Sequence, residues 1–154
     1  MKANYLIIPI ITFVTAAIGS FITNQGMDWY KTINLPTWTP PGSVIGTVWT
    51  VIFILSTISA LIFWNQYYGK KYYWLIILLF IINAFLNIVW SYLFFGLNLI
   101  VPAIFEAGLL GLSVLGIIIL ILPYSNLAAG LLLPYFAWVC FATYLTYNVW
   151  VLNK

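Results

Sequence analysis

The sequence predicts an all-α membrane protein, a bundle of five transmembrane helices, and two observations lead to this fold class. Of its 154 residues, 65% are hydrophobic and only 5% are charged, whereas soluble domains carry about 25% charged residues. In addition, five apolar runs each reach the length of roughly 20 residues that a helix needs to cross a bilayer. Because backbone polar groups in lipid must be satisfied within the segment, we expect these runs to be helices.

The expected helices span residues 5–23, 44–64, 72–95, 99–122 and 127–152 of one domain, 1–154. The joints that follow the second, third and fourth helices are short, so these helices should be antiparallel neighbours. The first joint, 24–43, is the long one and contains Pro36, Pro40 and Pro41. Proline fixes φ and has no N–H, so we expect a stiff, non-helical lid that ends where Pro41 or Gly42 opens the second helix.

The first apolar run also has features of a secretory signal peptide. Ala16, Ala17, Gly19 and Ser20 are the small residues typical of a cleavage region. From this pattern alone, a retained first helix and a removed signal peptide both remain open.

The composition excludes several kinds of chemistry. The chain has no His, so neither a Ser-His-Asp triad nor a His-ligated metal site can form, and no metal is expected. Its two acids, Asp28 in a joint and Glu106 in an apolar run, make a poor general acid/base pair. No Gly-rich phosphate loop occurs, and a net charge of +3 is too sparse for a nucleic-acid surface. We therefore expect no conventional enzyme, no required cofactor and no nucleic-acid partner.

Three predicted helices carry polar and aromatic residues on one face, at steps of three or four residues. These are Asn83, Asn87, Trp90 and Phe94 on the third helix, Trp49, Phe53, Ser56 and Ala60 on the second, and Trp138, Ala142, Leu145 and Val149 on the fifth. Since amides in a membrane are costly without partners, Asn83 and Asn87 should face inward. Two interpretations stay open: ordinary packing with hydrogen bonds across helices, or an internal pocket with aromatic walls for a flat apolar ligand.

The fourth predicted helix has two features of its own. An acid within a membrane span, here Glu106, is a functional hypothesis by default; the alternative is an interfacial carboxylate stabilised by the helix N-terminus. Ala103, Ala107 and Gly111 repeat at four-residue spacing, which predicts close helix packing inside the bundle or in a homodimer.

Three blocks of aromatic and proline residues occur in order along the chain. They are Trp29-Tyr30 with Pro36-Thr37-Trp38-Thr39-Pro40-Pro41 and Gly46-Thr47-Val48-Trp49; Asn87-Ile88-Val89-Trp90 with Phe94-Phe95-Gly96; and Pro134-Tyr135-Phe136-Ala137-Trp138 with Phe141-Ala142-Thr143. Together they resemble the TspO/MBR family, also called tryptophan-rich sensory proteins, translocator proteins or peripheral-type benzodiazepine receptors. The resemblance covers about residues 28–153.

The resemblance implies a five-helix bundle that keeps its first helix, integral to the lipid bilayer of what we expect to be a bacterial cell membrane. It also implies a pocket between the first, second, third and fifth helices beneath the proline-rich lid. The implied ligands are porphyrins such as protoporphyrin IX, isoquinoline carboxamide or benzodiazepine drugs and, in vertebrates, cholesterol. The implied ligand-binding residues are Tyr30, Trp38, Trp49, Phe53, Asn83, Asn87, Trp90, Trp138 and Ala142.

The resemblance leaves three functions open. The first is tetrapyrrole binding in a transport or sensory, stress-response role. The second is an enzyme for light-dependent porphyrin degradation, with Trp49 and Trp138 as catalytic electron donors, and the third is a structural stress-response component.

The chain departs from the family pattern at several positions. Leu35 replaces a Lys, Ser43 a Trp, Asn83 a Gln and Thr146 an Asn. The cation of the sterol motif is missing after Tyr147, so we do not expect cholesterol to be recognised.

Overall fold

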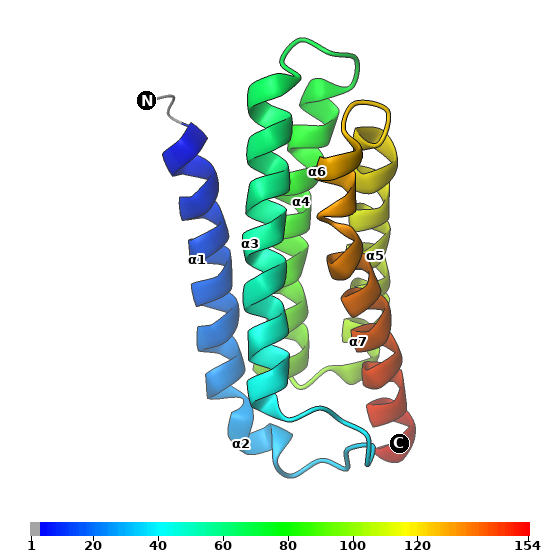
Figure 1. The fold of residues 1–154 in the computed structure, drawn as a ribbon. Coiled ribbons are helices and arrows are strands. Elements are labelled where there is room, and N and C mark those ends of the chain that lie inside the picture. The colour runs from blue at the N-terminus through cyan, green and yellow to red at the C-terminus, as the bar shows by residue number, and fades with distance from the viewer. Residues whose placement is uncertain (1–3) are drawn as a thin grey trace.

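The computed structural model describes residues 4–154, and within them five helical spans are long and apolar enough to cross a membrane (Figure 1). The helices are α1 (Asn4–Gln25), α2 (Met27–Tyr30), α3 (Gly42–Gln66), α4 (Tyr73–Ser91), the π-helix η1 (Tyr92–Gly96), α5 (Ile100–Ile121), α6 (Asn126–Gly130) and α7 (Leu133–Leu152). The predicted all-α bundle of five spans is confirmed.

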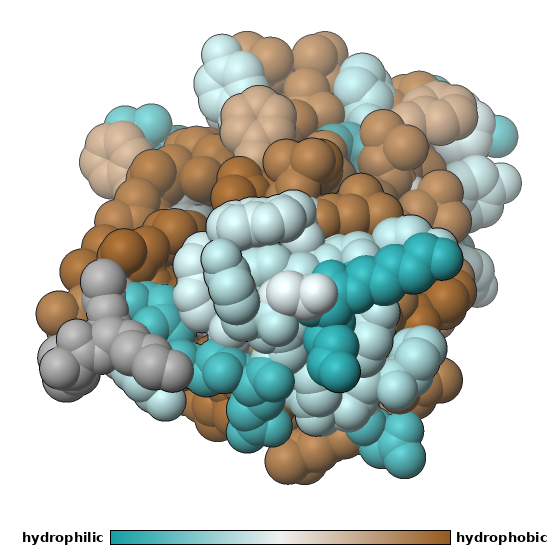
Figure 2. Space-filling model, turned by 90° about the horizontal axis from the view of Figure 1, so that it is seen from above, coloured by the Kyte–Doolittle hydropathy of each residue, from teal (hydrophilic) through white to brown (hydrophobic). Residues whose placement is uncertain are grey.

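The five spans form one bundle with the lid and the C-terminus at the same end (Figure 1). Helix α1 packs against α3 and α4. Helix α5 lies between α4 and α7, and α6 packs against α3, so the helices form a closed ring. Figure 2 looks onto the opposite end, which carries the joint between α3 and α4, and shows hydrophilic residues gathered there with apolar residues around the sides. Polar ends and apolar sides are the surface that a bilayer requires.

Helix α1 is a packed member of the bundle. Near its start, Asn4 Nδ2 donates to Asn65 Oδ1 of α3 at 2.9 Å. Where α1 meets α2, Gly26 is buried, and a Cβ there would collide with the carbonyl oxygen and side chain of Phe95 in η1. Only glycine permits this close approach of backbones, which sets the start of the lid against η1.

The first half of the lid departs from the prediction. Residues 24–43 were expected to be non-helical, but α1 continues to Gln25 and α2 forms one helical turn, closed by Tyr30 N–H to the Gly26 carbonyl at 3.0 Å. The reason is that the prolines begin only at Pro36, so the residues before it retain the N–H groups that a helix needs. Helix α3 does begin at Gly42, directly after Pro41.

The third predicted helix, 72–95, changes its winding before it ends. Over Tyr92–Gly96 it becomes a π-helix, and Leu97 N–H donates to the Tyr92 carbonyl at 2.8 Å. Asn98 then adopts a left-handed conformation with φ 58°, which Asn tolerates better than most residues. These two features produce the tight antiparallel turn into α5.

The fifth predicted helix, 127–152, is broken rather than continuous. Leu132 N–H donates to the Ala129 carbonyl at 3.1 Å instead of continuing the regular pattern. The carbonyl of Ala128 is thereby left free, and the hydroxyl of Ser59 on α3 donates to it at 2.8 Å. The carbonyl freed by the break is therefore hydrogen-bonded by another helix, and this bond joins α6 to α3.

Candidate ligand-binding site

A chain of polar side chains crosses the interior and joins three helices. Asn87 Nδ2 on α4 donates to the hydroxyl of Tyr135 on α7 at 3.2 Å, and that hydroxyl donates to Asn83 Oδ1 at 3.0 Å. Asn83 Nδ2 in turn donates to Ser113 Oγ on α5 at 2.8 Å. Both asparagines are only 7% exposed, so the prediction that they face inward is confirmed.

Aromatic rings of α3 lie against this polar chain. The ring of Trp49 packs edge-on against Tyr135 with centroids 5.9 Å apart, and Phe53 lies 5.7 Å from Trp49. The inward face predicted for the second span is thus brought to the polar side chains of α4 and α7.

A second aromatic group lies towards the lid. The ring of Trp90 stacks on Phe94 with centroids 5.3 Å apart, and Tyr30 of α2 packs against Phe94 at 6.2 Å and Phe95 at 5.5 Å. Burial of Tyr30 raises the pKa of its hydroxyl above the ordinary value, so it remains a neutral donor and acceptor at physiological pH.

A third aromatic group lies on α7, and it includes the one predicted site residue that the structure does not bring inside. Trp38 is 44% exposed and stacks on Tyr144 at 5.6 Å and against Phe141 at 5.9 Å. Phe141 also contacts Trp138, at 5.1 Å. Trp38 therefore covers the side of α7, and Phe141 lies between it and Trp138 in this series of ring contacts.

The lid is also tied to the end of the chain. Asn34 N–H donates to Asn153 Oδ1 at 2.9 Å, and Asn153 Nδ2 donates back to the Asn34 carbonyl at 2.8 Å. This reciprocal pair, together with Trp38, holds the lid on α7.

Among residues 4–154, several buried polar atoms in the interior have no hydrogen-bond partner. They are the indole Nε1 atoms of Trp90 and Trp138, the hydroxyl of Ser56 and both carboxyl oxygens of Glu106. Ala142, half-buried, lies one turn beyond Trp138 on the same face of α7. Because most buried polar atoms in proteins are hydrogen-bonded, this interior has unused donors on α4 and α7 and unused acceptors on α5.

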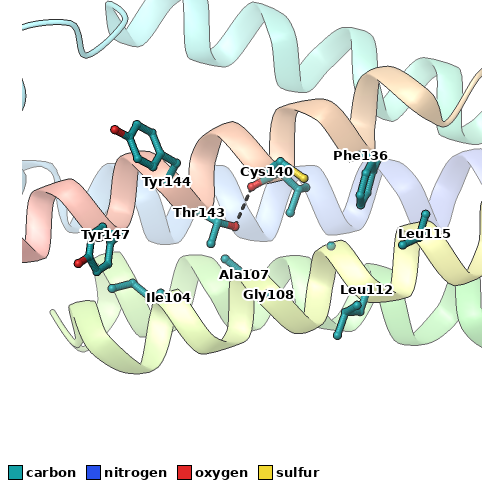
Figure 3. A pocket seen from close by; sticks show the side chains of 12 residues that line it. Ile104, Ala107, Gly108, Leu112, Leu115, Phe136, Cys140, Thr143, Tyr144 and Tyr147 are labelled. Carbon is teal, nitrogen blue, oxygen red and sulfur yellow. Dashed lines mark hydrogen bonds between the residues drawn. The ribbon is translucent and has the colours of Figure 1, made fainter.

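Two grooves on the outside of the bundle do not coincide with the predicted pocket. The larger, about 550 Å³, lies between α5 and α7 and is lined by residues such as Gly108, Leu112 and Cys140 (Figure 3). The smaller, about 230 Å³, lies at the start of α3. Neither includes Trp49 or Trp138, and inside the bundle the ring of Trp49 contacts its neighbours directly.

The fourth span carries the two features noted in its sequence, an acidic residue and a row of small residues. Glu106 is 5% exposed, so the carboxyl lies inside the bundle, and its depth in the bilayer stays a prediction. Ala103, Ala107 and Gly111 are buried, and a Cβ on Gly111 would lie 3.4 Å from Cγ1 of Val139 on α7. These small residues therefore let α5 pack closely on α7. The homodimer remains a prediction.

Two members of the polar chain, Tyr135 and Ser113, were not predicted as site residues. Tyr135 precedes Trp138 by three positions and Ala142 by seven, so it extends the same inward helix face and the spacing could have identified it. Ser113 lies seven positions after Glu106, again on one face, but nothing in the sequence pairs it with Asn83.

Comparisons with known proteins agree with this architecture. The profile of the TspO/MBR family matches residues 7–151. The tryptophan-rich protein TspO of Bacillus cereus is 32% identical over 154 residues, which cover 99% of each chain. The protein of the same name from Archaeoglobus fulgidus is 34% identical over 141 residues, 88% of this chain and 87% of the relative. The translocator protein of Homo sapiens is 31% identical over 135 residues, 86% of this chain and 80% of the relative.

These matches extend over nearly the whole chain and include bacterial proteins. Five apolar spans support the predicted membrane location, and the Bacillus relatives support a bacterial membrane. This chain is an integral membrane protein and belongs to the TspO/MBR family.

Proposed function

We propose that this protein binds a tetrapyrrole such as protoporphyrin IX inside its helical bundle, in a transport or sensory role. The observation that carries the proposal is the pair of buried indole N–H groups without acceptors, on Trp90 and Trp138. Aromatic rings offer flat apolar area to a macrocycle. The indole N–H groups could donate to its carboxylates, which accept strong hydrogen bonds.

The packing of the helices favours ligand access from the lid end. Helix α3 packs on α1 and α6 and touches α7 much less. At that end the lid is held by Trp38 on Tyr144 and by Asn34 on Asn153. Release of these contacts would separate the lid from α7, and rotation of Trp49 away from Tyr135 would open space for a flat ligand.

The name of the human relative, translocator protein, is in keeping with a transport role for this chain. Isoquinoline carboxamides carry a carbonyl acceptor on a flat ring system, so we expect them to compete with a porphyrin for the same indole donors. Cholesterol has a single hydroxyl and no aromatic face, and we expect it not to compete.

Titration with protoporphyrin IX in detergent tests the proposal through tryptophan fluorescence. We expect saturable quenching at one porphyrin per chain, and weaker binding by Asn87→Leu, which removes an inward amide. Folding should survive this change, since hydrogen bonds between membrane helices contribute about 0.6 kcal/mol on average. Asn148→Leu is the matched control, because the Asn148 amide donates to the Tyr144 carbonyl of its own helix rather than to another helix of residues 4–154.

The proposal fails if quenching does not saturate and equals that of an unrelated tryptophan-rich membrane protein. Equal affinities for the Asn87→Leu and Asn148→Leu variants would instead place the ligand away from the polar chain.

A further inference from the structure

The buried carboxyl of Glu106 makes no hydrogen bond with the other described residues. Its residue is 5% exposed, and neither oxygen has a hydrogen-bond partner. A carboxyl group is costly in an apolar interior unless it is hydrogen-bonded or paired with a charge. Among residues 4–154, Glu106 therefore lacks the partner that such a carboxyl requires.

Helix register places Glu106 at the same depth as Trp90. The hydrogen bond from Asn83 to Ser113 sets α4 level with α5 at that point. Seven residues separate Ser113 from Glu106, and seven separate Asn83 from Trp90. Since the two helices are antiparallel, both steps lead about 10 Å towards the lid. An unused acceptor on α5 and the unused indole donor on α4 thus lie at one level of the bundle.

This level lies between two apolar clusters. On α5, Leu110 belongs to the larger cluster and Ala103 to the smaller one near the lid, and Glu106 lies between them in sequence. On α4, the half-buried Leu86 packs against the larger cluster and Trp90 against the smaller. The hydrophobic core is therefore interrupted at the depth where Glu106 points inward.

No lysine of residues 4–154 balances this carboxyl. Lys31 pairs with Asp28 at 3.6 Å, at the lid. Lys71 lies over the ring of Tyr72 at 4.8 Å, in the joint at the opposite end. The remaining two, Lys70 and Lys154, are exposed on the surface. Among the described residues, no side chain supplies a complementary charge to Glu106, which leaves that role open to a bound molecule.

We infer that the interior site takes a flat aromatic ligand that presents a cationic or N–H donor group to Glu106, beside an acceptor that it presents to the indole of Trp90. The inference rests on the proposed function and specifies its ligand class. A carboxyl that faces a cationic group is ionised and then only accepts hydrogen bonds, so a ligand with anionic groups on every edge fits this level poorly. A ligand with a donor on one edge and an acceptor on another satisfies both residues.

Two porphyrins with the same ring distinguish this ligand class, one with ammonium-ended and one with carboxylate-ended side chains. Each is titrated into the wild type, Glu106→Gln and Asp28→Asn, with tryptophan quenching as the readout. Asp28→Asn is the matched control, because it removes one negative charge from a side chain that is 99% exposed.

Glu106→Gln should weaken binding of the ammonium porphyrin about tenfold, because a hydrogen bond to a charged group exceeds one to a neutral group by roughly the 1.4 kcal/mol that corresponds to a factor of ten. The carboxylate porphyrin should bind this variant no more weakly than wild type, and Asp28→Asn should bind both like wild type.

The outcomes separate the two proposals. If wild type binds neither porphyrin saturably, the proposed function itself fails. If wild type binds and Glu106→Gln changes both affinities by less than twofold, or changes them equally, only the inference about Glu106 is overturned. Glu106→Asp guards against a folding defect in the Gln variant: it keeps the charge but withdraws the carboxyl, so it should also weaken the ammonium porphyrin selectively.

Discussion

Replacement of Tyr135 by Phe removes the hydroxyl at the centre of the polar chain. That hydroxyl accepts from Asn87 Nδ2 at 3.2 Å and donates to Asn83 Oδ1 at 3.0 Å. The edge-on contact of its ring with Trp49 at 5.9 Å should persist, because Phe keeps the ring. The substitution therefore isolates the polar contribution to the packing of α4 on α7.

The expected loss of stability follows from the two bonds and from what they leave behind. Hydrogen bonds between membrane helices average about 0.6 kcal/mol, so the pair contributes about 1.2 kcal/mol. Asn83 and Asn87 are both 7% exposed, and the substitution leaves Asn83 Oδ1 and Asn87 Nδ2 unpaired there; an unpaired buried polar group costs about 1–3 kcal/mol. Because that penalty already includes the lost bonds, we expect Tyr135→Phe to lower the free energy of unfolding by about 1–3 kcal/mol.

Unfolding by SDS in mixed micelles, followed by circular dichroism, measures this difference. Tyr144→Phe is the matched control, since Tyr144 lies on the same helix and is 60% exposed; its effect should stay within about 0.5 kcal/mol. If the two variants are equally stable, the polar chain does not hold the helices together and the reasoning is refuted.

Two further predictions concern the lid and the tryptophans. Asn153→Ala removes both hydrogen bonds to the Asn34 backbone. The Asn34 amide should then exchange hydrogen about tenfold faster, and porphyrin should associate faster. Unchanged exchange would show that these two bonds do not hold the lid on α7. Trp49→Phe should largely keep porphyrin affinity, because Phe retains aromatic area, whereas Trp138→Phe also removes an indole N–H and should weaken binding. If the protein is a photochemical enzyme, both should abolish light-dependent loss of the porphyrin absorption band. A wild-type loss no greater than that of free porphyrin would end the enzyme hypothesis.

Most of the bundle could be predicted because the bilayer imposes it. Bilayer thickness sets the length that an apolar run needs in order to span the membrane. Because the bilayer core holds no water, the backbone groups of such a run must hydrogen-bond to one another, and the run forms a helix. The helical period then decides which residues share a face, which is why Asn83, Asn87 and Trp49 could be assigned to the interior.

The remaining features depend on contacts between segments that are distant in sequence. At the break in the fifth span, the Ala128 carbonyl accepts a hydrogen bond from Ser59 of α3. No local sequence pattern predicts a contact between these two residues. Trp38 lies outside the interior, where its ring packs on Tyr144 and Phe141 of α7. The isolation of Glu106 is likewise visible only once α4 and α7 are placed around it.

The most direct test of an internal ligand site follows the indole N–H signals of ¹⁵N-labelled tryptophan by NMR during a titration with protoporphyrin IX. The buried indoles of Trp90 and Trp138 have no acceptor, so their signals should shift and saturate together at one ligand per chain. Trp74, 66% exposed at the start of α4, should not move. Shifts confined to Trp74 and Trp38, with Trp90 and Trp138 unchanged, would show that porphyrin binds the surface and would contradict the account.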